Sequence, residues 1–143
     1  MNSQAGYDIV GPLTQTAFGC LLNLNSILGN SYVYVRADTD SGTVDPNAAP
    51  TLQNAQAGGL STSIYMKLCR GSDPANQVGA ILSGIDSNLY SILWLKAEPN
   101  NAVGCSWTGY SQADNCAFLT AALTVPLQNG ILPGVFSTSY IWH

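Results

Sequence analysis

Short runs of apolar, β-branched and aromatic residues alternate along this chain with amphipathic segments. The runs predict five β-strands, at residues 6–10, 31–37, 61–67, 92–98 and 133–137. The segments between them predict four helices, at residues 14–24, 49–57, 74–88 and 112–129. Strict alternation of this kind favours an α/β fold with a parallel sheet, because parallel neighbours need a long crossover, usually a helix.

The strongest helix signal lies in residues 74–88. Apolar side chains recur there at i, i+3, i+4 and i+7 from Val78, behind Asp73 as a candidate N-cap and Pro74 in the first turn. Proline in the interior of a helix removes a hydrogen bond, so we expect Pro126 to kink or shorten the last helix.

Length, composition and net charge indicate the size of the domain and exclude several kinds of partner. The chain has 143 residues, the size of one domain, and only 8% of them are charged. A net charge of -4 argues against nucleic acid and against an anionic membrane surface as partners. No apolar run approaches the length of a membrane span.

Several kinds of active site lack their motifs in this sequence. Four cysteines without a Cys-x-x-Cys pair, and one histidine, argue against a zinc site. That histidine is the terminal His143 and no Gly-x-Ser-x-Gly elbow is present, which argues against a nucleophilic triad. The turn after the first strand lacks a Gly-x-Gly-x-x-Gly loop, which argues against dinucleotide binding.

Two architectures fit the order of elements: a doubly wound five-stranded sheet, or a barrel that lacks its last strands. In both, functional side chains lie at the carboxyl ends of the strands. The residues at these ends are Asp8, Arg36, Asp38, Tyr65, Lys67, Lys96, Glu98 and Ser137.

Two of these residues, Asp8 and Glu98, are carboxylates on separate strands. In a barrel both would point into one mouth, where a pair of carboxylates can flank a glycosidic bond. Alternatively, Asp8 caps a turn and Glu98 is a solvated strand end. Aromatic side chains in strands belong more often to the core, so Trp94 is interpreted as core, and Trp107 and Tyr110 are better candidates for stacking on sugars.

Five segments, taken in order along the chain, carry a resemblance to a known family. They are Gly6-Tyr7-Asp8, Tyr34-Val35-Arg36-Ala37, Val44-Asp45-Pro46-Asn47-Ala48, Asn54-Ala55-Gln56-Ala57-Gly58-Gly59-Leu60 and Leu93-Trp94-Leu95-Lys96-Ala97-Glu98. With Gly104-Cys105-Ser106-Trp107 and Asn115-Cys116, they resemble the landmarks of glycoside hydrolase family 25 lysozymes, especially the eukaryotic branch.

The resemblance implies a modified TIM-like barrel in a single domain, residues 1–143, with five βα units present and the last three strands missing at the C-terminus. It also implies cleavage of the β-1,4 bond between N-acetylmuramic acid and N-acetylglucosamine in bacterial peptidoglycan, without metal or cofactor. Open edges at residues 6–10 and 133–137 would then favour self-association.

Carried over by position, Glu98 resembles the family's general acid and Asp8 its supporting first-strand aspartate. Lys96 stands where the family's Asp-x-Glu motif begins with aspartate, so we expect weakened catalysis and an ion pair from Lys96 to Asp8 or Glu98. The residues expected to bind substrate are Arg36, Tyr65, Lys96, Trp107 and Tyr110.

Two other functions stay open: a glycan-binding relative without catalysis, and a doubly wound interaction module. Cys105 and Cys116 bracket one loop and are expected to form a disulfide, while Cys20 and Cys69 are expected to be unpaired. A disulfide favours a secreted or a lysosomal or phagosomal location, although residues 1–4 carry no signal-peptide pattern.

Overall fold

A computed structural model describes residues 5–28 and 31–142; residues 1–4 and His143 lie outside this description. The five predicted strands are confirmed as β1 (Ala5–Ile9), β2 (Ser31–Arg36), β3 (Ser61–Lys67), β4 (Ile92–Ala97) and β5 (Leu132–Ser137). The four predicted helices are confirmed as α1 (Gln15–Leu28), α2 (Ala48–Ala57), α3 (Pro74–Gly84) and α4 (Gln112–Gln128). Two short 3-10 helices, η1 (Ser87–Leu89) and η2 (Ser139–Trp142), complete the order.

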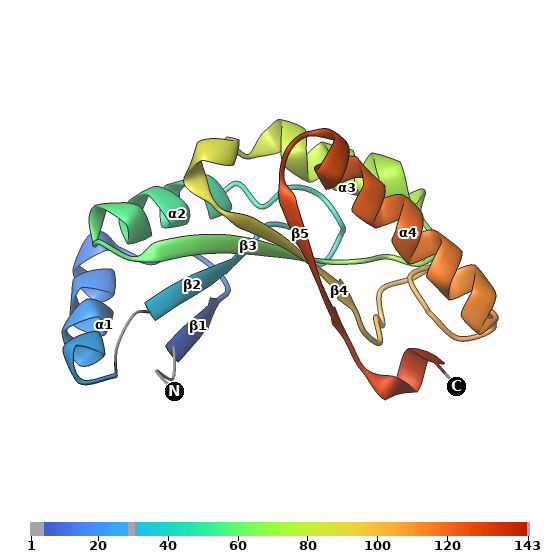
Figure 1. The fold of residues 1–143 in the computed structure, drawn as a ribbon, viewed down its shortest axis with the longest axis horizontal. Helices are drawn as coiled ribbons and strands as arrows, with labels where there is room; N and C mark the ends of the chain where they lie inside the picture. Colours follow the sequence, from blue (N-terminus) through green and yellow to red (C-terminus); the bar gives the residue numbers. More distant parts are fainter. Residues whose placement is uncertain (1–4, 29–30, 143) are drawn as a thin grey trace.

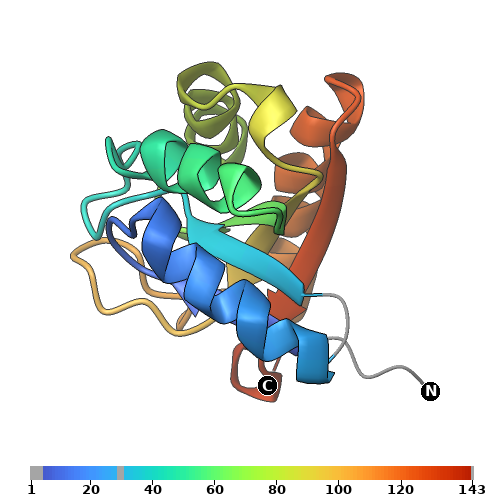
Figure 2. The ribbon, with the colours of Figure 1, turned by 90° about the vertical axis from the view of Figure 1, so that its left-hand side faces the viewer.

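The strands form one parallel sheet in the order β1-β2-β3-β4-β5. A doubly wound sheet reverses its strand order midway to place helices on both faces, so the doubly wound alternative is wrong. Sequential order with right-handed crossovers instead puts the helices on one face. Figure 1 shows them along the convex side of the curved sheet, and Figure 2 shows α1 beside α2 there.

The hydrophobic core lies between the sheet and the helices. In β2 and β4 alternate side chains are buried, so Val33 and Leu93 face the helices while Tyr34 and Trp94 face the concave side. Phe18 from α1 and Leu52 from α2 are fully buried against this layer. The period-two alternation therefore separates a core face from a second face that no α-helix of the described residues covers.

Two helices end differently from their predictions. Helix α3 begins as expected, with Asp73 accepting a hydrogen bond from the Asn76 backbone N–H, but it ends at Gly84. Ile85 has an extended backbone conformation, and its side chain is buried in the core. Asp86 then caps the separate 3-10 turn η1, so the prediction of one helix to residue 88 is wrong.

Helix α4 continues through Pro126 to Gln128, so the predicted shortening is also wrong. Pro126 is buried in the last turn of α4. Proline has no backbone N–H, so it removes a single helical hydrogen bond at this position. None of the helices within the described ranges is both long and apolar enough to span a bilayer.

Candidate functional site

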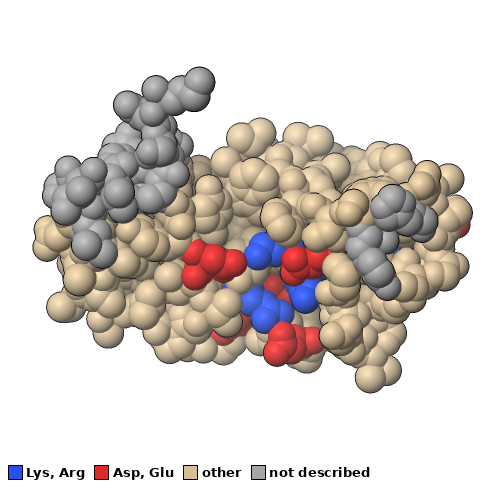
Figure 3. Space-filling view, turned by 90° about the horizontal axis from the view of Figure 1, so that it is seen from below, with Lys and Arg blue, Asp and Glu red and all other residues tan. Residues whose placement is uncertain are grey.

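Charged side chains are rare in this chain, and many of them gather at one place. Three of its four basic residues, Arg36, Lys67 and Lys96, lie at the carboxyl ends of β2, β3 and β4. Each forms an ion pair with an acidic side chain. Figure 3 shows the charged side chains together in the middle of the face that carries them.

Both lysines neutralise a carboxylate of the predicted acidic pair. The Lys96 Nζ lies 3.2 Å from Asp8 Oδ2, which confirms the expected ion pair for Asp8. The Lys67 Nζ lies 3.6 Å from Glu98 Oε1, so Glu98 pairs with the lysine of the neighbouring strand. Because Lys67 and Lys96 are register partners on β3 and β4, the two ion pairs lie next to each other.

Arg36 holds the loop that follows β2. Its guanidinium donates to the buried Asp38 and, at 2.7 Å, to the exposed Asp40. Asp38 also accepts a hydrogen bond from the backbone N–H of Lys67, which links the ends of β2 and β3. Burial raises the pKa of Asp38, while Arg36 and the Lys67 N–H act in the opposite direction.

An open cavity of about 360 Å³ lies on the concave face. Its lining residues are Asp8, Tyr34, Tyr65, Trp94, Lys96 and Phe136. Two of the rings lie against strand glycines: a Cβ on Gly134 would come within 2.5 Å of the Trp94 ring, and one on Gly6 within 2.7 Å of the Tyr34 ring. The glycines therefore let both rings approach the backbone of a neighbouring strand closely.

Tyr65 connects the aromatic and charged parts of this cavity. Its ring lies 3.8 Å from the Lys96 ammonium, a cation–π distance, and its hydroxyl donates to Asp8. Burial raises the pKa of Tyr65, and the hydrogen bond to Asp8 and the Asp8 charge add to this effect. Asp8 thus links Lys96 and Tyr65 in one network, in which burial and Asp8 favour the protonated Tyr65 phenol.

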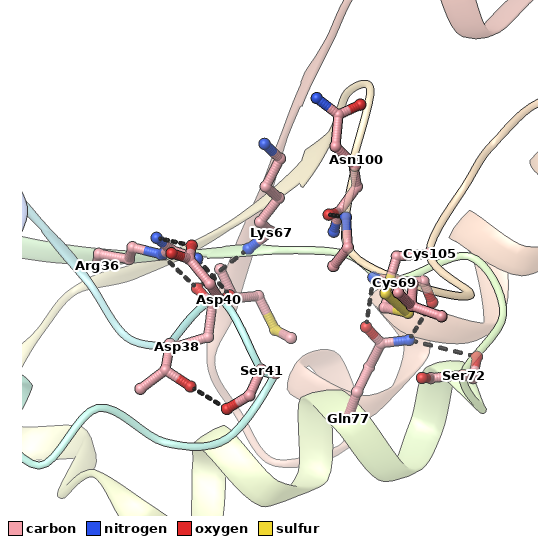
Figure 4. A pocket seen from close by; sticks show the side chains of 16 residues that line it. Arg36, Asp38, Asp40, Ser41, Lys67, Cys69, Ser72, Gln77, Asn100 and Cys105 are labelled. Carbon is pink, nitrogen blue, oxygen red and sulfur yellow. Dashed lines mark hydrogen bonds and ion pairs between the residues drawn. A yellow bond between two sulfur atoms is a disulfide. The ribbon is translucent and has the colours of Figure 1, made fainter.

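A second cavity, of about 410 Å³, lies between the loops that follow β2, β3 and β4 (Figure 4). Arg36, Asp40 and Ser41 lie on one side of it, Asn100 and the Cys69–Cys105 disulfide on the other, and Lys67 between them. Gln77 of α3 donates to and accepts from the backbone of Cys69, which fixes the base of the β3 loop.

The disulfide corrects the predicted cysteine pairing. Cys69 bonds to Cys105, whereas Cys20 and Cys116 are exposed free thiols. The expected Cys105–Cys116 bond is wrong because α4 begins between these residues, and Cys105 packs instead against the β3 loop. Gly71 shares this contact, since a Cβ there would overlap the carbonyl of Gly104.

The structure reverses the expected places of the aromatic residues, for which the sequence predicted Trp94 in the core and Trp107 and Tyr110 at the sugar site. Trp94 lines the aromatic cavity instead of the helix-facing core. Trp107 is 3% exposed and packs edge to face on Phe118, so it offers no free ring face to a ligand. Tyr110 is exposed, but Arg70 covers its ring at 3.8 Å, and neither it nor Trp107 lines the aromatic cavity.

Some residues of the site were absent from the sequence prediction. Tyr34 and Phe136 complete the aromatic cavity, and counting two positions back from Arg36 on its strand would have found Tyr34. Asn100 lies in a loop without periodicity, so no pattern indicated it. Among the described residues, no group of three or more His, Cys, Asp or Glu side chains is arranged to hold a metal ion.

Comparisons with known proteins give consistent matches. A family model described as "Lysozyme-like protein 1" matches residues 1–143. The chain is 32% identical over 144 residues to Lysozyme-like protein 5 of Caenorhabditis elegans, covering 96% of this chain and 62% of that protein. It is 27% identical over 117 residues to probable GH family 25 lysozyme 3 of Dictyostelium discoideum, covering 79% of this chain and 24% of that protein. The chain therefore spans less than two thirds of the length of either relative.

Two solved structures share the arrangement of elements. The muramidase from Trichobolus zukalii superposes with a TM-score of 0.74 at 17% identity, covering 98% of this chain and 68% of that one. The muramidase from Acremonium alcalophilum superposes with a TM-score of 0.73 at 19% identity, covering 96% of this chain and 66% of that one. At such identities the likeness is one of fold.

Proposed function

The chain belongs to the lysozyme-like family of glycoside hydrolase family 25 type lysozymes, and from this we propose that it acts on the glycan strands of bacterial peptidoglycan as a weak glycosidase. The bond cleaved would be the β-1,4 linkage between N-acetylmuramic acid and N-acetylglucosamine. The observation that carries the proposal is the aromatic cavity beside the two carboxylates. Its rings offer apolar faces on which sugars stack, and Asp8 lies at its edge.

In this proposal Glu98 is the general acid that protonates the leaving oxygen. Its side chain is 25% exposed, so a bound glycan can reach it. The Lys67 ammonium at 3.6 Å occupies one side of the carboxylate, and it must move aside before Glu98 delivers a proton. Arg36, Tyr65 and Lys96 are the substrate-contacting residues, since all three lie at the carboxyl ends of neighbouring strands.

Lys96 accounts for the proposed weakness. An ammonium at this position repels the positive charge that develops on the sugar in the transition state. It also neutralises Asp8, the carboxylate that would otherwise stabilise that charge. The same ion pair favours a second candidate function, a glycan-binding relative that no longer cleaves.

Turbidity clearing of bacterial cell walls, with sedimentation on insoluble peptidoglycan, distinguishes the two functions. The wild type should bind and clear slowly, Glu98→Gln should bind with clearing reduced about 100-fold or more, and Lys96→Asp should clear faster. Asp73→Asn is the control, because asparagine still caps α3 while one negative charge is removed outside the site.

The possible results bear on different parts of the proposal. Clearing that is unchanged in Glu98→Gln removes the role given to Glu98. Binding without clearing in the wild type and in Lys96→Asp favours the glycan-binding relative, and absence of binding rejects both functions.

Two finer features belong to the same proposal. We take the curved sheet as part of the wall of a modified barrel, a view supported by the sequential strand order and the aromatic cavity on the concave side. We place the protein in a secreted or a lysosomal or phagosomal setting, because disulfides such as Cys69–Cys105 persist under oxidising conditions.

A further inference from the structure

We propose that the cavity between the loops after β2, β3 and β4 binds a short peptide that branches from the glycan, one with small apolar side chains and carboxylates. This inference rests on the proposed glycan function, because it assigns the two cavities to the two parts of one branched substrate.

The two cavities differ in chemistry. The concave-face cavity has four aromatic residues in its lining, whereas the cavity between the loops has none. Side-chain amides, hydroxyls and small apolar groups line the second cavity instead, together with two ion-paired cations: Arg36 pairs with Asp38 and Asp40 of the same lining, and Lys67 pairs with Glu98. Rings suit the flat faces of sugars, while amides and methyl groups suit the amides and alanine-type side chains of a peptide. A carboxylate of the peptide would have to compete with the acidic partners of Arg36 and Lys67.

The loop after β4 carries two side chains with unused binding capacity. Val103 is 103% exposed, which leaves an apolar side chain without a packing partner at the rim of the cavity. Asn101 is also exposed, and its amide forms no hydrogen bond with the described part of the chain. The Cys69–Cys105 disulfide fixes the base of this loop, so the two side chains are held at the cavity.

The two cavities share a border at the ends of β2, β3 and β4. Arg36 of the second cavity is the register partner of Tyr65 in the aromatic cavity, and Lys67 is the register partner of Lys96. Adjacent strands lie about 4.8 Å apart. A glycan in the aromatic cavity would thus have its branch point within reach of the second cavity.

Binding of the peptide at Lys67 would also affect Glu98. The Lys67 ammonium lies on the cavity border and holds Glu98 through an ion pair at 3.6 Å, the longest of the ion pairs described. A carboxylate of the peptide that binds Lys67 competes with Glu98 for it. A peptide-bearing glycan would therefore both bind more tightly and release Glu98 for proton transfer.

Titration calorimetry with three probes tests the inference. They are the disaccharide N-acetylglucosaminyl-N-acetylmuramic acid with its lactyl group capped as a methylamide, the same disaccharide bearing an Ala-Glu-type tetrapeptide, and the tetrapeptide alone. The proteins are the wild type, an Asn101→Ala/Val103→Ala double variant, and a Leu127→Ala/Gln128→Ala control. The control removes the same kinds of exposed side chain at the end of α4, outside both cavities.

We expect the wild type and the control to bind the peptide-bearing disaccharide about tenfold more tightly than the capped one. The double variant should lose this preference while its affinity for the capped disaccharide stays unchanged. Equal wild-type affinities for the two disaccharides would overturn the peptide site and leave the glycan function intact. If the wild type bound the free tetrapeptide but not the capped disaccharide, and the double variant lost this binding, the peptide site would be supported and the glycan function rejected.

Discussion

The Lys96 ammonium lies 3.2 Å from Asp8 Oδ2, so β4 and β1 are joined by an ion pair across the two strands between them. In a flat sheet, strands three positions apart would be separated by about 14 Å. That these two side chains meet reflects the curvature of the sheet around its concave face. Lys96 therefore lines the aromatic cavity, with its ammonium over the rings of Tyr65 and Phe136.

Replacing Lys96 with methionine should have a small effect on stability. The ion pair with Asp8 and the contact with the Tyr65 ring are both partly exposed, and each is worth up to about 1 kcal/mol. Urea denaturation should show a free energy of unfolding about 1 kcal/mol lower than that of the wild type. A loss several times larger would mean that Lys96 has a structural role beyond these contacts.

The packing of Trp94 against Gly134 predicts a site-specific effect of one methyl group. In Gly134→Ala the new Cβ overlaps the indole, so we expect Trp94 to tilt, its fluorescence to shift, and the unfolding free energy to fall by about 1–3 kcal/mol. Affinity for peptidoglycan should fall with it. Gly79→Ala is the matched control, because that helical position has open space and alanine should stabilise α3 there. Unchanged fluorescence and binding in Gly134→Ala would contradict this packing.

The Cys69–Cys105 disulfide closes a loop with a sequence separation of 36 residues. Loop-closure entropy predicts that its reduction lowers the free energy of unfolding by about 3–4 kcal/mol. Denaturation with and without a reducing agent measures the loss, and mass spectrometry after alkylation checks the pairing. Cys116→Ser should leave stability unchanged, because that thiol is free and exposed. An effect of Cys116→Ser as large as that of reduction would mean that the pairing differs.

Tyr65 should make stability depend on pH in the alkaline range. Its folded-state pKa is raised above the ordinary tyrosine value by burial and by Asp8. The folded protein then holds a proton that the unfolded chain has lost, so this contribution is intact below about pH 10 and is lost as the pH rises beyond that. Tyr65→Phe should weaken the alkaline loss of stability and remove one late-ionising tyrosine from the absorbance titration. If the absorbance lost in Tyr65→Phe lies in the pH range where the exposed tyrosines ionise, Tyr65 ionises with them and the raised pKa is contradicted.

The sequence predicted much of the fold because two local rules hold along this chain. Runs of apolar, β-branched and aromatic residues marked all five strands, and the cap at Asp73 with Pro74 marked the start of α3. The ends of elements were less certain, since Ile85 is placed by burial in the core and not by helix propensity. Pro126 likewise stays helical because its buried side chain packs in the last turn of α4.

The candidate site could be predicted only in part. The rule that carboxyl ends of parallel strands meet at one edge identified Asp8, Arg36, Lys67, Lys96 and Glu98, all of which lie in the charged cluster. Trp107 was misplaced because the chemistry of a tryptophan is the same in a core and in a groove, and only its 3% exposure separates the two.

By itself, the sequence determined the class of fold, the strands that carry the charged residues and the family to which the chain belongs. The tertiary structure decided which side chains pair: Lys96 with Asp8, Lys67 with Glu98, and Cys69 with Cys105. Local order follows from spacing along the chain, whereas these pairings join residues far apart in sequence. They depend on the curvature of the sheet and on how the loops at its carboxyl edge pack, and no local pattern encodes either.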